Sequence, residues 1–227
     1  NKFADKHNNM FTFSFGEIQR YYEFLEIISG RWEGIEAEYV AGVRHMMETS
    51  KKNPGTHVMT TNEWALHEES RKKSTLLHLE MESYYLFSKI MLDKVARSIE
   101  FFFGATRNLP LDSHDDLTKN LVKIAEQKSL LVSEGLLVLI PRLKKTVSDF
   151  RDQQIAHQKS PRVTRGTVFS DDGSTKIMIN MLYPKETDVQ SEGVNLSELR
   201  ALIDQYLDEV VRFLEVNFIK TRLNLVG

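Results

Sequence analysis

The stretch "ESYYLFSKIMLDKVARSIEFFFG", Glu82 to Gly104, decides the fold. Its apolar residues recur at steps of three and four, the period of a helix with one buried face. They include Tyr84, Phe87, Ile90, Met91, Val95, Ile99 and Phe102. The pattern extends upstream, where Thr61 or Asn62 is expected as N-cap and Glu63 places an acid in the first turn. Together these features predict one long helix that ends near the glycine.

The segment before this helix has the same period. From Phe15 to about Thr49, apolar residues again follow three- and four-residue steps, and Gly30 and Gly34 are expected to interrupt the pattern. The breaker "KKNPGTH", Lys51 to His57, then separates two antiparallel helices.

Two further helical segments follow the long helix. "RNLPLDSHD", Arg107 to Asp115, forms the connection, and Asp112 or Ser113 is expected to cap a third helix. "GLLVLI", Gly135 to Ile140, predicts buried core, and Pro141 marks a helix start or a kink. The apolar face of these segments comprises Leu117, Leu121, Ile124, Leu130, Leu131, Leu143, Val147 and Phe150.

The pattern changes after Pro161. Two strand-like runs, residues 162–169 and 175–183, flank "SDDGS", and the Asp-Gly pair is typical of a tight hairpin turn. A last amphipathic helix follows from about Ser197. The sequence therefore predicts one all-α domain over residues 1–227. It is an up-down bundle of four to five helices, with a small β-hairpin at about 163–183 inserted before the C-terminal helix.

Composition narrows the classes of function. In 227 residues, 41% are hydrophobic and 27% charged, enough for a packed core. The absence of cysteine excludes disulfides and thiolate chemistry, and no apolar run approaches the roughly 18 residues of a membrane span. We expect no membrane association and a cytoplasmic location. The chain begins without methionine, so its true N-terminus stays open.

Charge and motifs exclude further classes. A formal charge of −2 argues against a broad basic surface for nucleic acid, but a local basic patch remains compatible with it. The zinc motif HExxH and the phosphate-binding motifs GxxxxGK[ST] and GxGxxG do not occur. We therefore expect no metal and no cofactor.

A second stretch, "FRDQQIAHQK" from Phe150 to Lys159, concentrates polar groups at the end of an apolar-periodic helix. Arg151 and His157 are separated by five residues, and Asp152 directly follows the arginine. Two other pairs, Arg71 with His78 and Arg107 with His114, have six residues between them. Neither has the same context, because the first arginine lacks such a polar follower and His114 falls in the proline-containing connection.

This motif and the order of the helices resemble HEPN domains, all-helical bundles that carry an arginine, four to six residues, and a histidine. The resemblance covers roughly Tyr21 to Lys159. It implies a homodimer that cleaves RNA without metal, in a toxin–antitoxin or phage-defence setting, with RNA and an antitoxin or regulatory protein as partners. It further implies that His157 is the general acid/base and Arg151 the phosphate clamp, with Asp152 orienting one of them.

Helix geometry agrees with a paired site. Six residues turn a straight helix by about 600°, so Arg151 and His157 lie roughly 120° and 9 Å apart. A two-fold interface brings each group beside its symmetry mate. A histidine with a pKa near 6.5 exchanges protons near neutrality, and the arginine fork suits phosphate oxygens. We expect Lys159, Arg162 and Arg165 to hold flanking phosphates.

Three alternatives stay open. The motif is also compatible with an ordinary helix end, where His and Lys complement the helix dipole. A non-catalytic helical dimer that binds a partner protein or a nucleotide is the second alternative, and a regulatory scaffold is the third. For residues 163–183, a simple connector is favoured over a lid above the site, since connectors are commoner.

Overall fold

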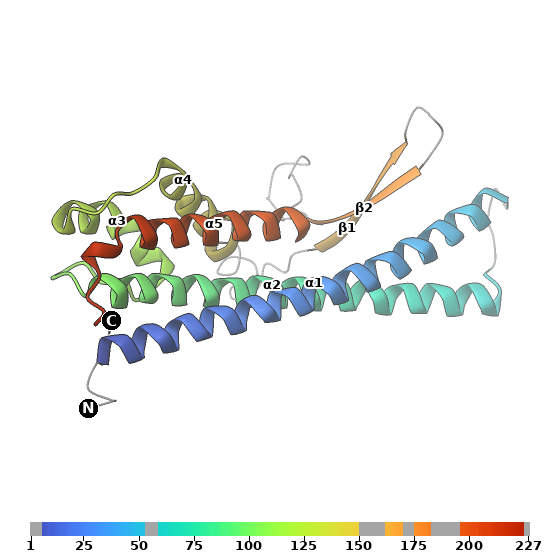
Figure 1. The fold of residues 1–227 in the computed structure, drawn as a ribbon. Coiled ribbons are helices and arrows are strands. Elements are labelled where there is room, and N and C mark those ends of the chain that lie inside the picture. Colours follow the sequence, from blue (N-terminus) through green and yellow to red (C-terminus); the bar gives the residue numbers. More distant parts are fainter. Residues whose placement is uncertain (1–5, 53–58, 150–161, 170–174, 183–195, 225–227) are drawn as a thin grey trace.

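The protein is described here by a computed structural model that covers residues 6–52, 59–149, 162–169, 175–182 and 196–224. This part is mainly helical (Figure 1). Its α-helices are α1 (Lys6–Lys52), α2 (Thr61–Phe103), α3 (His114–Lys128), α4 (Glu134–Leu143) and α5 (Leu196–Val216). The shorter elements are the π-helix η1 (Lys144–Asp149), the strands β1 (Arg162–Phe169) and β2 (Thr175–Leu182), and the 3-10 helix η3 (Phe218–Lys220).

The architecture is a helical bundle built around α2. Helices α1 and α2 form a long antiparallel pair, and α3, α4 and α5 gather at the end where α1 begins and α2 ends (Figure 1). Helix α2 packs against α1, α3, α5 and η1, and its Leu77, Met91 and Val95 are fully buried. Of the described helices, none is long and apolar enough to cross a membrane.

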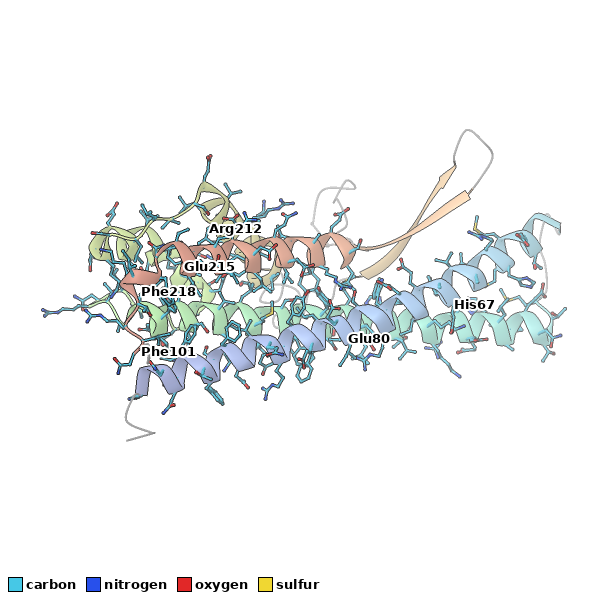
Figure 2. All side chains as sticks on the ribbon, in the orientation of Figure 1. His67, Glu80, Phe101, Arg212, Glu215 and Phe218 are labelled. Atoms are coloured by element: carbon cyan, nitrogen blue, oxygen red, sulfur yellow. The ribbon has the colours of Figure 1, made fainter. Side chains whose placement is uncertain are left out.

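Helix α1 differs from the sequence expectation because it runs without interruption through Gly30 and Gly34. The reason is tertiary packing. Leu25, Ile28 and Trp32 are buried in the core, and a helix packed along its length tolerates the roughly 1 kcal/mol that each glycine costs. An ion pair between Arg31 and Glu80, at 2.8 Å, also joins α1 to α2; Figure 2 labels Glu80 on α2.

The ends of α2 and α3 follow local chemistry. The N-cap of α2 is Thr60, so Thr61 and Asn62 were the wrong candidates, because Glu63 closes a reciprocal capping box with Thr60. Gly104 ends α2 with φ +79°, as the sequence predicts. Ser113 caps α3 and accepts a hydrogen bond from the N–H of Asp116, which confirms one of the two candidates.

Helix α4 only partly fits the prediction of a buried run. Leu136, Leu139 and Ile140 are buried, whereas Leu137 and Val138 are exposed. Consecutive residues on a helix point about 100° apart, so a continuous apolar run cannot face the core throughout. Pro141 lies inside the helix, and the helix continues past it into η1.

The two strands pair antiparallel, in a register that runs from Arg162 opposite Leu182 to Phe169 opposite Thr175. Residues 170–174, which contain the Asp-Gly pair, lie outside the described residues. The hairpin turn therefore stays a prediction.

Candidate functional site

Most of the expected site residues lie in a segment that the structure does not describe. Arg151, Asp152, His157 and Lys159 all fall within 150–161, outside the described residues. Arg162 and Arg165 belong to β1, opposite Leu182 and Ile179 of β2. The described residues therefore do not test whether the arginine and the histidine meet.

The elements on either side of this segment are described. The π-helix η1 ends at Asp149, and β1 begins at Arg162. Both pack against α2, and η1 also packs against α3. Val147 and Ser148 of η1 are fully buried. A π-helix is rare and occurs frequently at functional sites.

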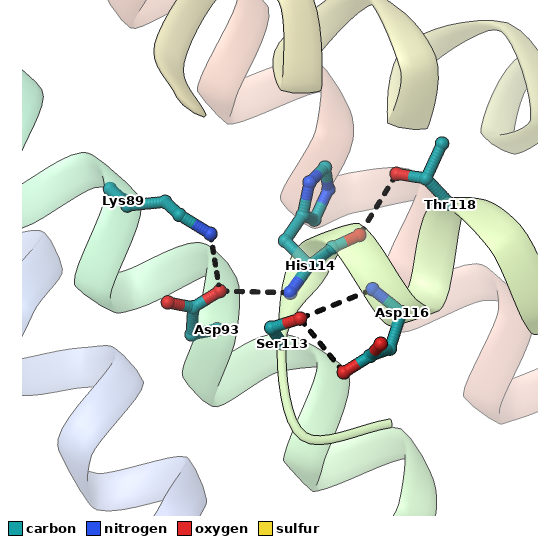
Figure 3. A network of polar contacts seen from close by, with 6 residues as sticks. All are labelled: Lys89, Asp93, Ser113, His114, Asp116 and Thr118. Carbon is teal, nitrogen blue, oxygen red and sulfur yellow. Dashed lines mark hydrogen bonds and ion pairs between the residues drawn. The ribbon is translucent and has the colours of Figure 1, made fainter. Parts of the chain in front are cut away.

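A partly buried polar network lies where α3 meets α2, and Figure 3 shows it. The Asp93 carboxylate accepts a 2.8 Å bond from the Lys89 ammonium and another of 2.8 Å from the backbone N–H of His114. The Thr118 hydroxyl donates to the His114 carbonyl at 2.9 Å. Asp93 thus supplies a partner for one of the N–H groups that the first turn of α3 leaves unpaired.

The ring of His114 has a different environment. It is completely buried, it contacts the ring of Tyr206 edge-on at 5.5 Å, and neither ring nitrogen has a hydrogen-bond partner among the described residues. Burial, and then the positive charges of Lys89 and Lys144, lower the pKa of His114 to about 3. The imidazole is therefore neutral at physiological pH and cannot act there as a general acid.

His114 is the notable residue that sequence reasoning misplaced. It is the first residue of α3 rather than part of the preceding loop. The signal was present in the sequence, because Ser113 as N-cap, followed by Asp115 and Asp116, already places His114 in a first helical turn.

The buried histidine predicts a specific loss of stability in acid. Above pH 6.5 the ring is neutral in both the folded and the unfolded chain. As the pH falls from 6.5 toward 3, only the unfolded chain binds the proton, so folding loses about 2 kcal/mol by pH 5. Between pH 7 and pH 5 the unfolding free energy of the wild type should therefore fall by about 2 kcal/mol more than that of the variant His114→Phe. Urea denaturation at the two pH values measures this difference.

The exposed His45 provides the control for this experiment. The variant His45→Gln should keep the acid sensitivity of the wild type, because it leaves the buried ring of His114 in place. An equal loss of stability in His114→Phe and the wild type would contradict the assignment of a neutral buried imidazole.

Like the ring of His114, several buried hydroxyl groups in this region have no hydrogen-bond partner among the described residues. Ser88 on α2, Ser148 on η1 and Tyr206 on α5 each bury an oxygen without a hydrogen-bond partner among the described residues. Burial, followed by the charge of Asp93, raises the pKa of Tyr206. Because the Asp93 carboxylate on α2 accepts the backbone N–H of His114 on α3, we assign the network around Asp93 an anchoring role between these two helices.

Metal chemistry has no built site in the part of the chain that is described: no three His, Asp or Glu side chains gather there as metal ligands would. Comparison with known proteins adds no assignment. No family model matches the chain, and neither the curated proteins nor the solved structures contain a match.

Proposed function

We propose that this protein is a metal-independent endoribonuclease that acts as a homodimer through Arg151 and His157. The proposal rests on the HEPN-like motif, and one structural observation supports it. The two elements that flank residues 150–161, η1 and β1, both pack against the central helix α2. A segment held at both ends on the same helix is a suitable place for a site that requires fixed geometry.

The proposed chemistry uses only side chains of the protein. His157 takes a proton from the 2′-hydroxyl, which attacks the adjacent phosphorus, and the leaving 5′-oxygen receives a proton in return. Arg151 holds the phosphoryl oxygens with its planar fork, and Asp152 orients one of the two groups. The products are a cyclic phosphate and a free 5′-hydroxyl.

Local positive charge is compatible with an RNA substrate. Arg142 and Lys145 are exposed on α4 and η1, immediately before the motif, and Lys144 is partly exposed beside them. In the proposal, Lys159, Arg162 and Arg165 extend this charge on the other side of the motif. The proposal further takes β1 and β2, which pair antiparallel, as a hairpin between the site and α5. In this proposal the enzyme acts in the cytoplasm on RNA, under control of an antitoxin or regulatory protein.

The direct test is a cleavage assay with the wild-type protein and end-labelled RNA in EDTA. We expect cleavage, with products that carry a cyclic phosphate and a 5′-hydroxyl, and a protein that sediments as a dimer. Cleavage that requires a divalent cation, or products with a 5′-phosphate, would contradict the mechanism. A dimer that cleaves none of a broad set of RNAs would favour the non-catalytic alternative.

A further inference from the structure

A concave, positively charged surface lies at the end of the bundle where α2 terminates. We call it the basic pocket. It is a cavity of about 500 Å³ lined by Arg107, Lys128, Lys220 and Arg222, together with Gln127 and Thr221. Among the described residues that line it, none is acidic. Since the whole chain has a formal charge of −2, four cations around one cavity are a marked local concentration.

Three segments far apart in the sequence build the basic pocket. Arg107 comes from the α2–α3 connection, Lys128 from the last turn of α3, and Lys220 and Arg222 from the C-terminal tail. At this end of the bundle, where Figure 2 labels Phe218 of η3, the Phe218 ring lies tilted against the ring of Phe102, with centroids 6.3 Å apart. The basic pocket therefore exists only in the folded chain.

The tail is fixed to the end of α2 by direct contacts. The backbone N–H of Arg222 and the hydroxyl of Thr221 both donate to the carbonyl of Phe102, at 2.7 and 2.9 Å. The Arg222 side chain lies against Gly104, where an added Cβ would approach its Cγ to 3.0 Å. A glycine with φ +79° at this position therefore allows the guanidinium stem to pass closely over the helix end.

The dipoles of α2 and α3 explain only part of this charge. Helix C-termini favour cations, and the Lys128 ammonium donates to the carbonyls of Phe103 and Ala105, at 3.1 and 3.4 Å. The side chains of Arg107, Lys220 and Arg222 make no ion pair or hydrogen bond with any described residue. Burial and the charge of Arg222 lower the pKa of Lys128, against the opposing effect of Glu100. The cations thus repel one another, and no acidic side chain among the described residues lines the cavity between them.

We propose that the basic pocket binds the di- or triphosphate group of a small-molecule ligand. Two arginine forks and two ammonium groups match the several negative charges and many acceptor oxygens of such a group. The cavity is in the size range of small-molecule sites. A long RNA instead requires cations spread along a track, whereas these four converge on one cavity. This inference does not depend on the proposed ribonuclease activity.

The test is titration calorimetry of the full chain with inorganic triphosphate at low ionic strength. We compare the wild type with the double variant Arg107→Gln/Lys220→Gln, which removes two exposed cations without disturbing the anchored tail. Affinity should fall about a hundredfold, because each charged hydrogen-bonding partner contributes about tenfold. The matched control, Lys119→Gln/Lys123→Gln, removes two exposed charges from α3 outside the cavity and should retain the wild-type affinity.

Thermal melting without ligand verifies that both double variants fold. The inference would be overturned by equal affinity for triphosphate in the wild type and the pocket variant, or by no binding at millimolar triphosphate. It would also be overturned if an RNA oligonucleotide bound more tightly than triphosphate and lost that binding in the pocket variant. Sodium sulfate at matched ionic strength should displace bound triphosphate only weakly. If sulfate displaced it as readily as added triphosphate does, the site would not be specific for polyphosphate.

Discussion

The variant His157→Ala is expected to cleave RNA roughly a hundred- to ten-thousand-fold more slowly than the wild type, the usual contribution of a general acid/base. The alanine side chain is a methyl group, which cannot accept the 2′-hydroxyl proton or return one to the leaving oxygen. The measurement is the single-turnover rate on end-labelled RNA in EDTA. The wild-type rate should also vary with pH near the imidazole pKa, and the residual rate of the variant should not follow that dependence.

Two further variants separate catalysis from folding. His45→Ala removes an exposed histidine on α1 and should cleave RNA at the wild-type rate. Arg151→Lys keeps the charge but loses the planar fork, so it should retain a small part of the activity. The far-ultraviolet circular dichroism and the sedimentation of all variants should match the wild type. Undiminished cleavage by His157→Ala would exclude His157 from the chemistry.

The second large effect concerns stability. The variant Asp93→Ala should lose about 3 kcal/mol of unfolding free energy, because it leaves a buried ammonium and a backbone N–H without their acceptor. The Lys89 side chain is 8% exposed, and the N–H of His114 depends on the same carboxylate oxygen. Urea denaturation followed by circular dichroism measures the loss.

An exposed ion pair in the same region provides the matched control. Arg97 and Asp112 lie 2.9 Å apart, but their side chains are 46% and 61% exposed. Asp112→Ala should therefore cost less than about 1 kcal/mol. Lys89→Met removes the buried charge and fills its volume, so it should cost less than Asp93→Ala. If Asp93→Ala and Asp112→Ala lost the same unfolding free energy, the burial of Lys89 would not strengthen its ion pair with Asp93.

The sequence predicted those elements whose local signals agree with the packing. Gly104 and Ser113 end and begin helices as expected, because positive φ and N-cap geometry depend on few atoms near in sequence. The predicted N-cap of α2 lay one or two residues after the observed one, because Thr60, Thr61 and Asn62 are all good N-cap residues. Only the reciprocal bond to Glu63 selects the first of them.

Features decided by distant contacts could not be predicted in the same way. Nothing near Gly30 and Gly34 in sequence indicates that α2 supports α1 along its length. Likewise, the cations of the basic pocket come from three separate segments, so no motif marks them. Of the expected site, spacing and context in the sequence mark the motif, but residues 150–161 lie outside the described residues, and the proposed pairing with a second chain stays a prediction.

The length of α1 has a mechanical consequence. Its 47 residues span about 70 Å, and the far part of the α1–α2 pair extends beyond α3, α4 and α5 (Figure 1). A rotation of the whole pair by only about 5° would displace its two ends by about 6 Å relative to each other, given that length. The α1–α2 pair therefore amplifies motion. A sub-ångström rearrangement at its base displaces its distant end far enough to be measured as a distance change between spectroscopic labels.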